Sequence, residues 1–547
     1  MTDENSIEQI AHGFLADYLE FYPTLGAALG LHMYDGRAGD YSRAAIDAFL
    51  RTLAGWSRRL ADLDPALRRG PAAHDAALIE QAIARERFAW EVWREHERNP
   101  IAYSPALDLT VYLKRDYAPL PERLRALVSH LGEVPRVLDE MRGHLHQPLA
   151  RPVAEAAQEV FAGHLAFYDL ELPAHAAAVT DASVRSRFDA ARASAVEALR
   201  ETIAWLEASA SRARDGFAIG EAVLQEMLRT GEMVDVPLAR LLAVGEAELE
   251  RLSEDVRATA ARIDAHASPR EVMARLARHH PSEERLLPET RVLLEDLRQF
   301  LVDHDLVSVP ADTRPIVAET PAFNRWAFAM MDTAGPFETT ATESYYYITL
   351  PDPAWPPERR EEWLTKFDYA TLKDMSIHEA YPGHFVHFMA VRQAPSAAAR
   401  VLTWYSFVEG WAHYAEEMML EAGVDPTPQF RLAYLGEALV RQVRYLVAIR
   451  MHADGMGLDE ATRMFERYAF MEPLPARKEA LRGTFDPGYL NYTLGKFIVR
   501  RLRDAYRAER GAAFSLREFH DRLIGLGAPP LPVARGALLE YDDGTLL

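Results

Sequence analysis

The chain has 547 residues, of which 49% are hydrophobic and 26% are charged, an ordinary composition for a globular protein with a large core. Its formal net charge of −21 argues against binding to nucleic acid or to an anionic membrane surface, because the phosphates of both would be repelled. The sequence contains no cysteine, which excludes disulfides, zinc–thiolate sites and cysteine nucleophiles. Any metal must therefore be bound by histidine and carboxylate side chains.

The N-terminal segment predicts a cytoplasmic protein. Its first residues, MTDENSIEQIAHGF, are acidic and lack both the basic head and the apolar run of a signal peptide. No stretch of the chain reaches the roughly 18 uninterrupted apolar residues that a membrane span needs. We therefore expect a cytoplasmic location and no membrane partner.

Amphipathic helices are predicted over most of residues 1–305. In the segment 42–63, apolar residues recur at steps of three and four, a spacing that is typical of a helix with one buried face. Similar patterns fill much of the sequence up to residue 305, and no internal repeat of fixed period is present. This part of the chain is predicted to form an N-terminal helical lobe.

The composition changes at about residues 310–357, where proline, threonine, β-branched and aromatic residues predominate. This composition predicts a few short strands joined by loops, in a segment that we assign to residues 306–357. The run Tyr345-Tyr346-Tyr347 within it is predicted either to form a strand edge along which an extended peptide lies, or to place core aromatics on a strand.

Helical patterns resume at Glu358 and continue to about Ile524. No Gly/Ser-rich or strongly charged linker separates the two halves of the chain. We predict a mainly α protein with a small strand-rich insert, organised as a single domain over residues 1–547. Its two lobes are the N-terminal helical lobe and a C-terminal helical lobe at residues 358–547.

The most distinctive motif is SIHEAYPGHFVH, at residues 376–387. It starts like the H-E-x-x-H motif of zinc peptidases, but the position four after His378 is Pro382, and the next histidine is His384. On a regular helix, residues six apart differ by about 240° and point away from each other. His387, three residues further on, is either a competing ligand, a supporting group or a core residue. A metal shared by the first two histidines requires the helix to be distorted between them.

The dipeptide Pro382-Gly383 provides a cause for that distortion. Proline has no N–H to donate to the carbonyl of His378, and its ring clashes with this carbonyl, so the helix is expected to kink or break. Glycine can adopt the unusual backbone angles of the detour. We predict a bulge that turns His384 back towards His378. Glu379 then occupies the position of the general base that activates a metal-bound water in H-E-x-x-H enzymes.

A third ligand is predicted in the segment WYSFVEGWAHYAEEMMLE, at residues 404–421. Glu409, His413 and Glu416 are spaced i, i+4 and i+7, so they share one face of a helix. The surrounding aromatic residues indicate a buried helix, in which two carboxylates and an imidazole are costly unless a cation compensates them. Taken alone, the stripe also fits a solvated face or a salt-bridge ladder. Glu409 is the predicted ligand, with His413 and Glu416 as groups that support the ligands or contact substrate.

The segments HEAYPGH, EGWAHYAEE and DPGYLNYTLGKF resemble the signatures HEAxPGH, EGWAxYxE and PGQALSYKxG of a bacterial family known as domain of unknown function 885. The N-terminal FYPTLGAALGLHMYDGRAGDYS also resembles that family, so the resemblance covers nearly the whole chain. The family is grouped with the gluzincin-like metallopeptidases, helical enzymes whose zinc is held by two histidines and a glutamate. The resemblance implies a large metallopeptidase-like fold and one Zn²⁺ per chain. Its ligands would be His378, His384 and Glu409, with Glu379 as the base.

The third signature departs from the family pattern. Residues 487–495 read PGYLNYTLG, which is one residue shorter than the family signature between Pro-Gly and Tyr. Anchored on Tyr-x-x-Gly, the family tyrosine is Tyr492 and its lysine is Thr493, while the glutamine has no counterpart. By motif position, Tyr492 is predicted either to donate to the oxyanion of a tetrahedral intermediate or to be a tyrosine in a helix interior. Substrate contacts are expected to differ from those of other members, with Tyr489 taking part.

Three residues outside these motifs are candidates for substrate contacts. His452, in RYLVAIRMHADGMGLDE, matches a histidine that is common in the family, and it is predicted to contact substrate or the oxyanion. Arg444 and Arg482 have the charge to bind a carboxylate terminus, although the chain is rich in arginine.

Together the motifs predict a zinc-dependent hydrolase of amide bonds in peptides or peptide-like small molecules, in which Glu379 is the general base. Two alternatives stay open: a metal-dependent hydrolase of a non-peptide amide or ester, and a non-catalytic helical binding protein. A structural zinc has no use for a base beside a ligand, which favours an enzyme. The sequence leaves open the substrate, endo- or exo-cleavage, the native metal and the oligomeric state.

Overall fold

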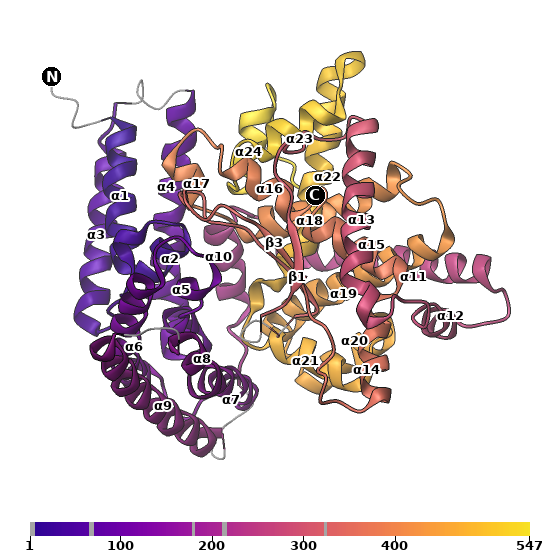
Figure 1. The fold of residues 1–547 in the computed structure, drawn as a ribbon. Coiled ribbons are helices and arrows are strands. Elements are labelled where there is room, and N and C mark those ends of the chain that lie inside the picture. Colours follow the sequence, from indigo (N-terminus) through magenta and orange to yellow (C-terminus); the bar gives the residue numbers. More distant parts are fainter. Residues whose placement is uncertain (1–5, 65–69, 178–180, 211–215, 322–324, 326) are drawn as a thin grey trace. The chain divides into compact units, whose positions relative to one another are not determined.

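The computed structural model describes residues 6–64, 70–177, 181–210, 216–321, 325 and 327–547. Helices predominate in this part of the chain, and its strands form one small sheet (Figure 1), which confirms the predicted mainly α fold with a strand-rich insert. None of the described helices combines the length and apolarity needed to span a lipid bilayer.

The chain forms two compact units, and the first consists of residues 1–231, 334–342 and 396–402. Its described α-helices are α1 (Ile7–Phe21), α2 (Pro23–Ala28), α3 (Arg43–Ala61), α4 (Pro71–Arg87), α5 (Val111–Lys114), α6 (Leu120–His144), α7 (Arg151–Ala166), α8 (Leu172–Ala176), α9 (Ala182–Ala210), α10 (Glu221–Gly231) and α17 (Ala397–Val401). The helices α1, α3 and α4 pack against one another, and α9 packs along α6 and α7 (Figure 1). The unit thus has a helical core of its own.

The second unit consists of residues 232–333, 343–395 and 403–547. Its described α-helices are α11 (Leu238–Ile263), α12 (Pro269–Leu276), α13 (Glu283–Asp303), α14 (Pro357–Leu364), α15 (Tyr369–Glu379), α16 (His384–Val391), α18 (Tyr405–Glu421), α19 (Pro428–Ala453), α20 (Leu458–Tyr468), α21 (Pro473–Gly483), α22 (Asn491–Arg510), α23 (Leu516–Ile524) and α24 (Leu531–Leu538). The long helix α19 packs against α11, α15 and α18. Helices that precede the strand-rich segment therefore share a core with helices that follow it.

The three strands of the second unit are β1 (Ile316–Glu319), β2 (Ala329–Asp332) and β3 (Tyr345–Ile348), in the order β1-β3-β2. β3 runs parallel to β1 and antiparallel to β2. The tyrosine run therefore forms the central strand, and the prediction that it provides a free edge is wrong. Tyr346 and Tyr347 are buried, as the alternative prediction of core aromatics requires. A strand edge is provided instead by β2.

Two glycines allow α18 and α22 to approach closely. A Cβ on Gly410 would lie 2.5 Å from the Cα of Gly495, and a Cβ on Gly495 would lie 1.9 Å from the carbonyl oxygen of Ser406. Any side chain at either position would push the two helices apart. These glycines belong to the EGWAHY and YTLGKF motifs, so the motifs determine the packing of the helices that carry Glu409 and Tyr492.

Candidate metal centre

The helix that carries the HEAYPGH motif is interrupted between its two histidines. α15 ends at Glu379, and α16 begins at His384. The sequence predicts this interruption, which takes the form of a break between two helices rather than a bulge within one. It turns the imidazoles of His378 and His384 towards each other, so that their ring centroids lie 4.9 Å apart with the planes at 89°.

Pro382 and Gly383 account for the break. Proline provides no N–H to continue the helix, and the N–H of Gly383 donates to the carbonyl of Ile377 at 2.9 Å. A Cβ on Gly383 would lie 1.6 Å from the carbonyl oxygen of His378, so a larger residue would displace this backbone. The indole N–H of Trp411 donates to the carbonyl of Pro382 at 3.0 Å, which satisfies a buried acceptor that has no helical partner.

Glu409 of α18 faces both imidazoles. Its Oε2 lies 3.5 Å from Nε2 of His378 and 3.5 Å from Nε2 of His384. Ligands at about 2.0–2.1 Å from a tetrahedral zinc ion are about 3.4 Å apart, so these separations match the edges of a zinc tetrahedron. This Oε2 atom is buried and accepts no hydrogen bond from the described residues. The three groups therefore fit a divalent cation in both spacing and chemistry.

The charges around these three groups also favour a bound cation. Burial would raise the pKa of Glu409, but the adjacent His384 and His378 hold it well below its usual range. Burial would lower the pKa of His378, but the neighbouring carboxylates of Glu409 and Glu416 raise it to about 10. The surroundings of His378 thus stabilise a positive charge, which a metal ion provides as well as a proton does.

Glu416, two turns after Glu409 on α18, holds His378 in place. Its Oε1 is 2.6 Å from Nδ1 of His378 and forms an ion pair with Nη2 of Arg441 at 3.1 Å, while its Oε2 is 3.0 Å from Nδ1 of His413. The bond to Nδ1 of His378 leaves the Nε2 lone pair available to a metal. Burial would raise the pKa of Glu416, but Arg441 and His413 hold it well below its usual range. Glu416 thus joins His378 and His413 in one buried polar cluster, and their predicted role in supporting a ligand stays a prediction.

Two further members of this buried network are absent from the predicted set. Asp374 lies four residues before His378 on α15, and burial together with Glu416 raises its pKa well above the usual range. Its helical spacing from His378 is a signal that sequence reasoning could have used. Arg441 comes from α19 and also pairs with Glu437 at 3.2 Å. One arginine among many gives no such signal, because its role depends on how α19 packs against α15.

Glu379 lies between the histidines and the edge of the sheet. Its carboxylate and the two ring nitrogens offered by His378 and His384 all lie within 4.8 Å of one another. Oε2 of Glu379 accepts a hydrogen bond from the N–H of Met331 in β2 at 2.9 Å. Because this N–H donates to Glu379 and not to β3, it lies on the outer edge of β2. The sheet edge thus lies directly beside the predicted base.

His384 and His387 have different surroundings. Nδ1 of His384 is buried and finds no hydrogen-bond partner in the described part of the chain, and its ring stacks on Phe388 at 5.6 Å. Nε2 of His387 is 3.0 Å from the carbonyl oxygen of Gly527, and burial lowers the pKa of His387 to about 4. His387 is therefore held by the backbone, which favours the core alternative over a ligand.

Tyr492, at the start of α22, lies near Glu409. Its ring contacts that of Tyr405, one turn before Glu409 on α18, with centroids 5.6 Å apart. The guanidinium groups of Arg444 and Arg482 lie 5.2 and 5.9 Å from its ring centroid. Burial and the charge of Glu409 raise the pKa of Tyr492, so the phenol keeps its proton at neutral pH. The packing thus brings a hydrogen-bond donor close to Glu409.

The two arginines beside Tyr492 already have partners. Arg444 donates to both oxygens of Glu479 at 2.7 Å. Arg482 donates from Nε to Asp486 at 3.0 Å and from Nη2 to the hydroxyl of Tyr405 at 2.8 Å. The sequence predicts that these arginines bind a substrate carboxylate. Such a carboxylate would have to bind the N–H groups that do not already donate to Glu479, Asp486 or Tyr405.

His452 and Tyr489 lie in the core. Nε2 of His452 is 2.7 Å from the carbonyl oxygen of Gly483, and burial lowers its pKa to about 4. Tyr489 lies in the 3₁₀ turn Pro487–Leu490 and is fully buried, with its hydroxyl 2.3 Å from where a Cβ on Gly483 would be. These positions favour packing at the end of α21 over the predicted contacts of both residues with substrate.

Comparison with known proteins identifies relatives but no activity. The family model "Bacterial protein of unknown function (DUF885)" matches residues 23–538. Two solved structures, each described as a "putative lipoprotein", share the fold. The one from Shewanella oneidensis, of unknown function, has 22% identity and a TM-score of 0.83 over 98% of this chain and 100% of its own. The one from Colwellia psychrerythraea has 17% identity and a TM-score of 0.79 over 97% and 98%. No curated protein matches the chain.

Proposed function

Because the chain belongs to the bacterial DUF885 family of unknown function, its chemistry has to be argued from its own residues, and we propose that it is a zinc-dependent hydrolase of peptide bonds. The observation that carries the proposal is the arrangement around Oε2 of Glu409. This buried oxygen lies 3.5 Å from Nε2 of both His378 and His384 and accepts no hydrogen bond from the described residues. The arrangement resembles the ligand set of the gluzincin-like metallopeptidases.

The two carboxylates near the histidines differ in a way that supports separate roles. One oxygen of Glu379 accepts the N–H of Met331, whereas Oε2 of Glu409 accepts no such donor from the described part of the chain. Glu409 would therefore hold the metal together with the two histidines, and Glu379 would stay beside it as the base. A zinc ion bound there polarises a carbonyl and lowers the pKa of a bound water.

The remaining steps are assigned to the protein's own groups. Glu379, oriented by Met331, takes the proton of the attacking water and later delivers it to the leaving amine. Tyr492 keeps its proton at neutral pH and donates a hydrogen bond to the oxyanion of the tetrahedral intermediate. His378 is held in one orientation by Glu416 throughout.

The edge of β2 supports a peptide substrate over other amides or esters. An extended peptide that adds to this edge would pass beside Glu379, because the outward N–H of Met331 already contacts that carboxylate. Main-chain hydrogen bonds to a strand edge recognise peptides of varied sequence. A small ester or non-peptide amide would make no use of this edge.

The proposal is tested by digesting a peptide library with the purified zinc-loaded protein and with the Glu379→Gln variant. We expect cleavage by the wild type and a fall of about 10²–10⁴-fold in the variant, with zinc retained. Glu358→Gln, an exposed change of the same kind on α14, is the control and should cleave normally. Cleavage of ester or non-peptide amide substrates alone would favour the alternative hydrolase. Equal cleavage by the Glu379→Gln variant would contradict the assigned base.

We also propose that the protein is cytoplasmic, because its formal net charge of −21 disfavours contact with an anionic membrane surface. The lipoprotein description of the two structural neighbours applies to those proteins and points the other way. Fractionation of bacteria that produce the full-length protein decides between the two locations. Recovery in the membrane fraction would contradict the proposal.

A further inference from the structure

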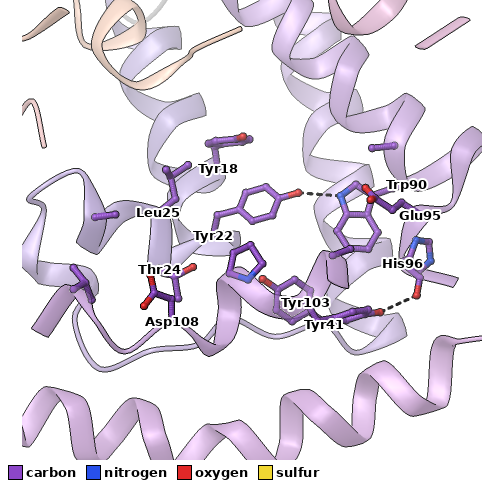
Figure 2. Close-up of a pocket in the computed structure, with 15 residues that line it drawn as sticks. Tyr18, Tyr22, Thr24, Leu25, Tyr41, Trp90, Glu95, His96, Tyr103 and Asp108 are labelled. Atoms are coloured by element: carbon purple, nitrogen blue, oxygen red, sulfur yellow. Dashed lines mark hydrogen bonds between the residues drawn. The ribbon is translucent and has the colours of Figure 1, made fainter. Parts of the chain in front are cut away.

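The first unit contains a cavity of about 410 Å³ that the proposed hydrolase chemistry does not use. All the residues that line it belong to this unit. Its volume is that of a small-molecule site. Figure 2 shows Tyr22, Trp90, Tyr103 and Tyr41 around the cavity, with Asp108 and Thr24 on the side opposite Trp90, Glu95 and His96.

Hydrogen bonds within the wall fix the aromatic rings. The indole N–H of Trp90 donates to the hydroxyl of Tyr22 at 3.1 Å (Figure 2). This hydroxyl in turn donates to Oε2 of Glu86 at 2.6 Å. The hydroxyl of Tyr103 donates to the carbonyl of His96 at 3.1 Å. Because these polar atoms are satisfied by the protein itself, what the wall offers a ligand is the surface of its rings.

The charged groups at the cavity are acidic. Glu95 and Asp108 line it, and neither lysine nor arginine does so among the described lining residues. Asp108 is exposed and accepts the N–H of Thr110 at 2.8 Å, and no described lysine or arginine forms an ion pair with it. Burial lowers the pKa of His96 to about 4, so this imidazole is neutral at pH 7 and adds no positive charge.

We propose that this cavity binds an amphipathic organic cation, an amine or quaternary ammonium that carries an apolar group. The electron-rich faces of tyrosine and tryptophan attract a cation, and the carboxylates of Glu95 and Asp108 add to this attraction. The apolar part of the ligand gains by leaving water for the aromatic wall. An anion of the same shape would be repelled, and a neutral molecule would lose the charge-dependent part of the affinity. The site is independent of the proposed hydrolase activity.

The test uses three probes with one skeleton and different charges: 4-phenylbutylamine, 4-phenylbutan-1-ol and 4-phenylbutyrate. Isothermal titration calorimetry of the full chain at pH 7 measures the affinity for each. We expect the amine to bind about tenfold more tightly than the alcohol, and the carboxylate to bind more weakly than either. Equal affinity for all three probes, tighter binding of the carboxylate, or no binding of the amine at millimolar concentration would overturn the proposal.

Two variants and one control locate the binding site. Asp108→Asn keeps an oxygen for the N–H of Thr110 and should weaken amine binding about fivefold while leaving alcohol binding unchanged. Asp47→Asn, which removes the same charge from an exposed position on α3, should change neither affinity. Trp90→Leu should reduce the preference for the amine over the alcohol. If this variant does not fold, the comparison of Asp108→Asn with Asp47→Asn tests the proposal by itself. Unchanged amine binding in Asp108→Asn would overturn the proposal.

A third variant separates this cavity from the metal centre, to which an amine could also bind. Glu379→Gln and chelator-treated protein should bind 4-phenylbutylamine as tightly as the untreated wild type. Loss of amine binding in either sample would place the amine at the metal centre and overturn the proposal.

Discussion

The acidic groups of the candidate metal centre and of the aromatic cavity differ in burial and in hydrogen-bond partners. In the metal centre, the carboxylate of Glu416 is fully buried, and three side chains satisfy it. At the cavity, Asp108 is exposed and water can satisfy it. A buried charge is costly unless it is paired, so the buried Oε2 of Glu409, with no hydrogen-bond donor among the described residues, fits a bound cation in a way that an exposed carboxylate does not.

The largest effect is expected at the candidate metal centre, when the backbone between the two histidines is altered. Gly383→Ala would place a Cβ 1.6 Å from the carbonyl oxygen of His378, which separates the imidazoles. We expect loss of bound zinc and of all peptide cleavage, measured by elemental analysis and digestion assays. The matched control is Gly436→Ala on α19, where the nearest atom is 3.7 Å away, and it should behave as the wild type. Normal zinc content in Gly383→Ala would contradict the role given to the helix break.

Removal of the proposed oxyanion donor should have the next largest effect. Tyr492→Phe keeps the ring against Tyr405 but loses the hydroxyl, so kcat should fall by about 10²-fold with zinc content and KM little changed. Tyr369→Phe, at an exposed position on α15, serves as the control. An unchanged kcat in Tyr492→Phe would assign this tyrosine to the helix interior alone.

A smaller effect on zinc binding is expected from Glu416, which contacts the candidate ligand His378. Glu416→Gln removes the charge that orients His378 and should weaken zinc binding by about 10- to 100-fold without abolishing it. Competition with a chelator of known affinity measures this change. Complete loss of zinc in Glu416→Gln would indicate that Glu416 binds the metal directly. An unchanged zinc affinity would show that Glu416 has no part in zinc binding.

The smallest effect is expected in the first unit. Tyr22→Phe loses the hydrogen bonds to Glu86 and Trp90, so the free energy of unfolding should fall by about 1–2 kcal/mol. Denaturant titration measures this change, and zinc content should stay normal. A loss of zinc would mean that the two regions are coupled, against the comparison drawn above.

The features that could be predicted from the sequence are local ones, which depend on residues close together in the chain. The break at Pro382-Gly383 follows from the chemistry of those two residues, and the shared face of Glu409 and Glu416 follows from helical spacing. The mainly α fold follows in the same way from periodicity.

Other features depend on contacts between distant segments, and these were not predictable. The place of Arg441 is set by the packing of α19, and that of Met331 by the sheet edge beside Glu379. The tyrosine run was misassigned because strand order is decided by partners far apart in the chain. Burial of Tyr489 depends on how its turn packs around Gly483.

The most direct test of the proposed metal centre is the zinc content of protein purified without chelator. The wild type and Glu379→Gln should each bind about one zinc ion per chain, and His384→Ala should bind none while remaining folded. Circular dichroism checks the fold of each sample. A wild-type protein that stays free of metal after incubation with zinc, or a His384→Ala variant that binds a full equivalent, would contradict the account.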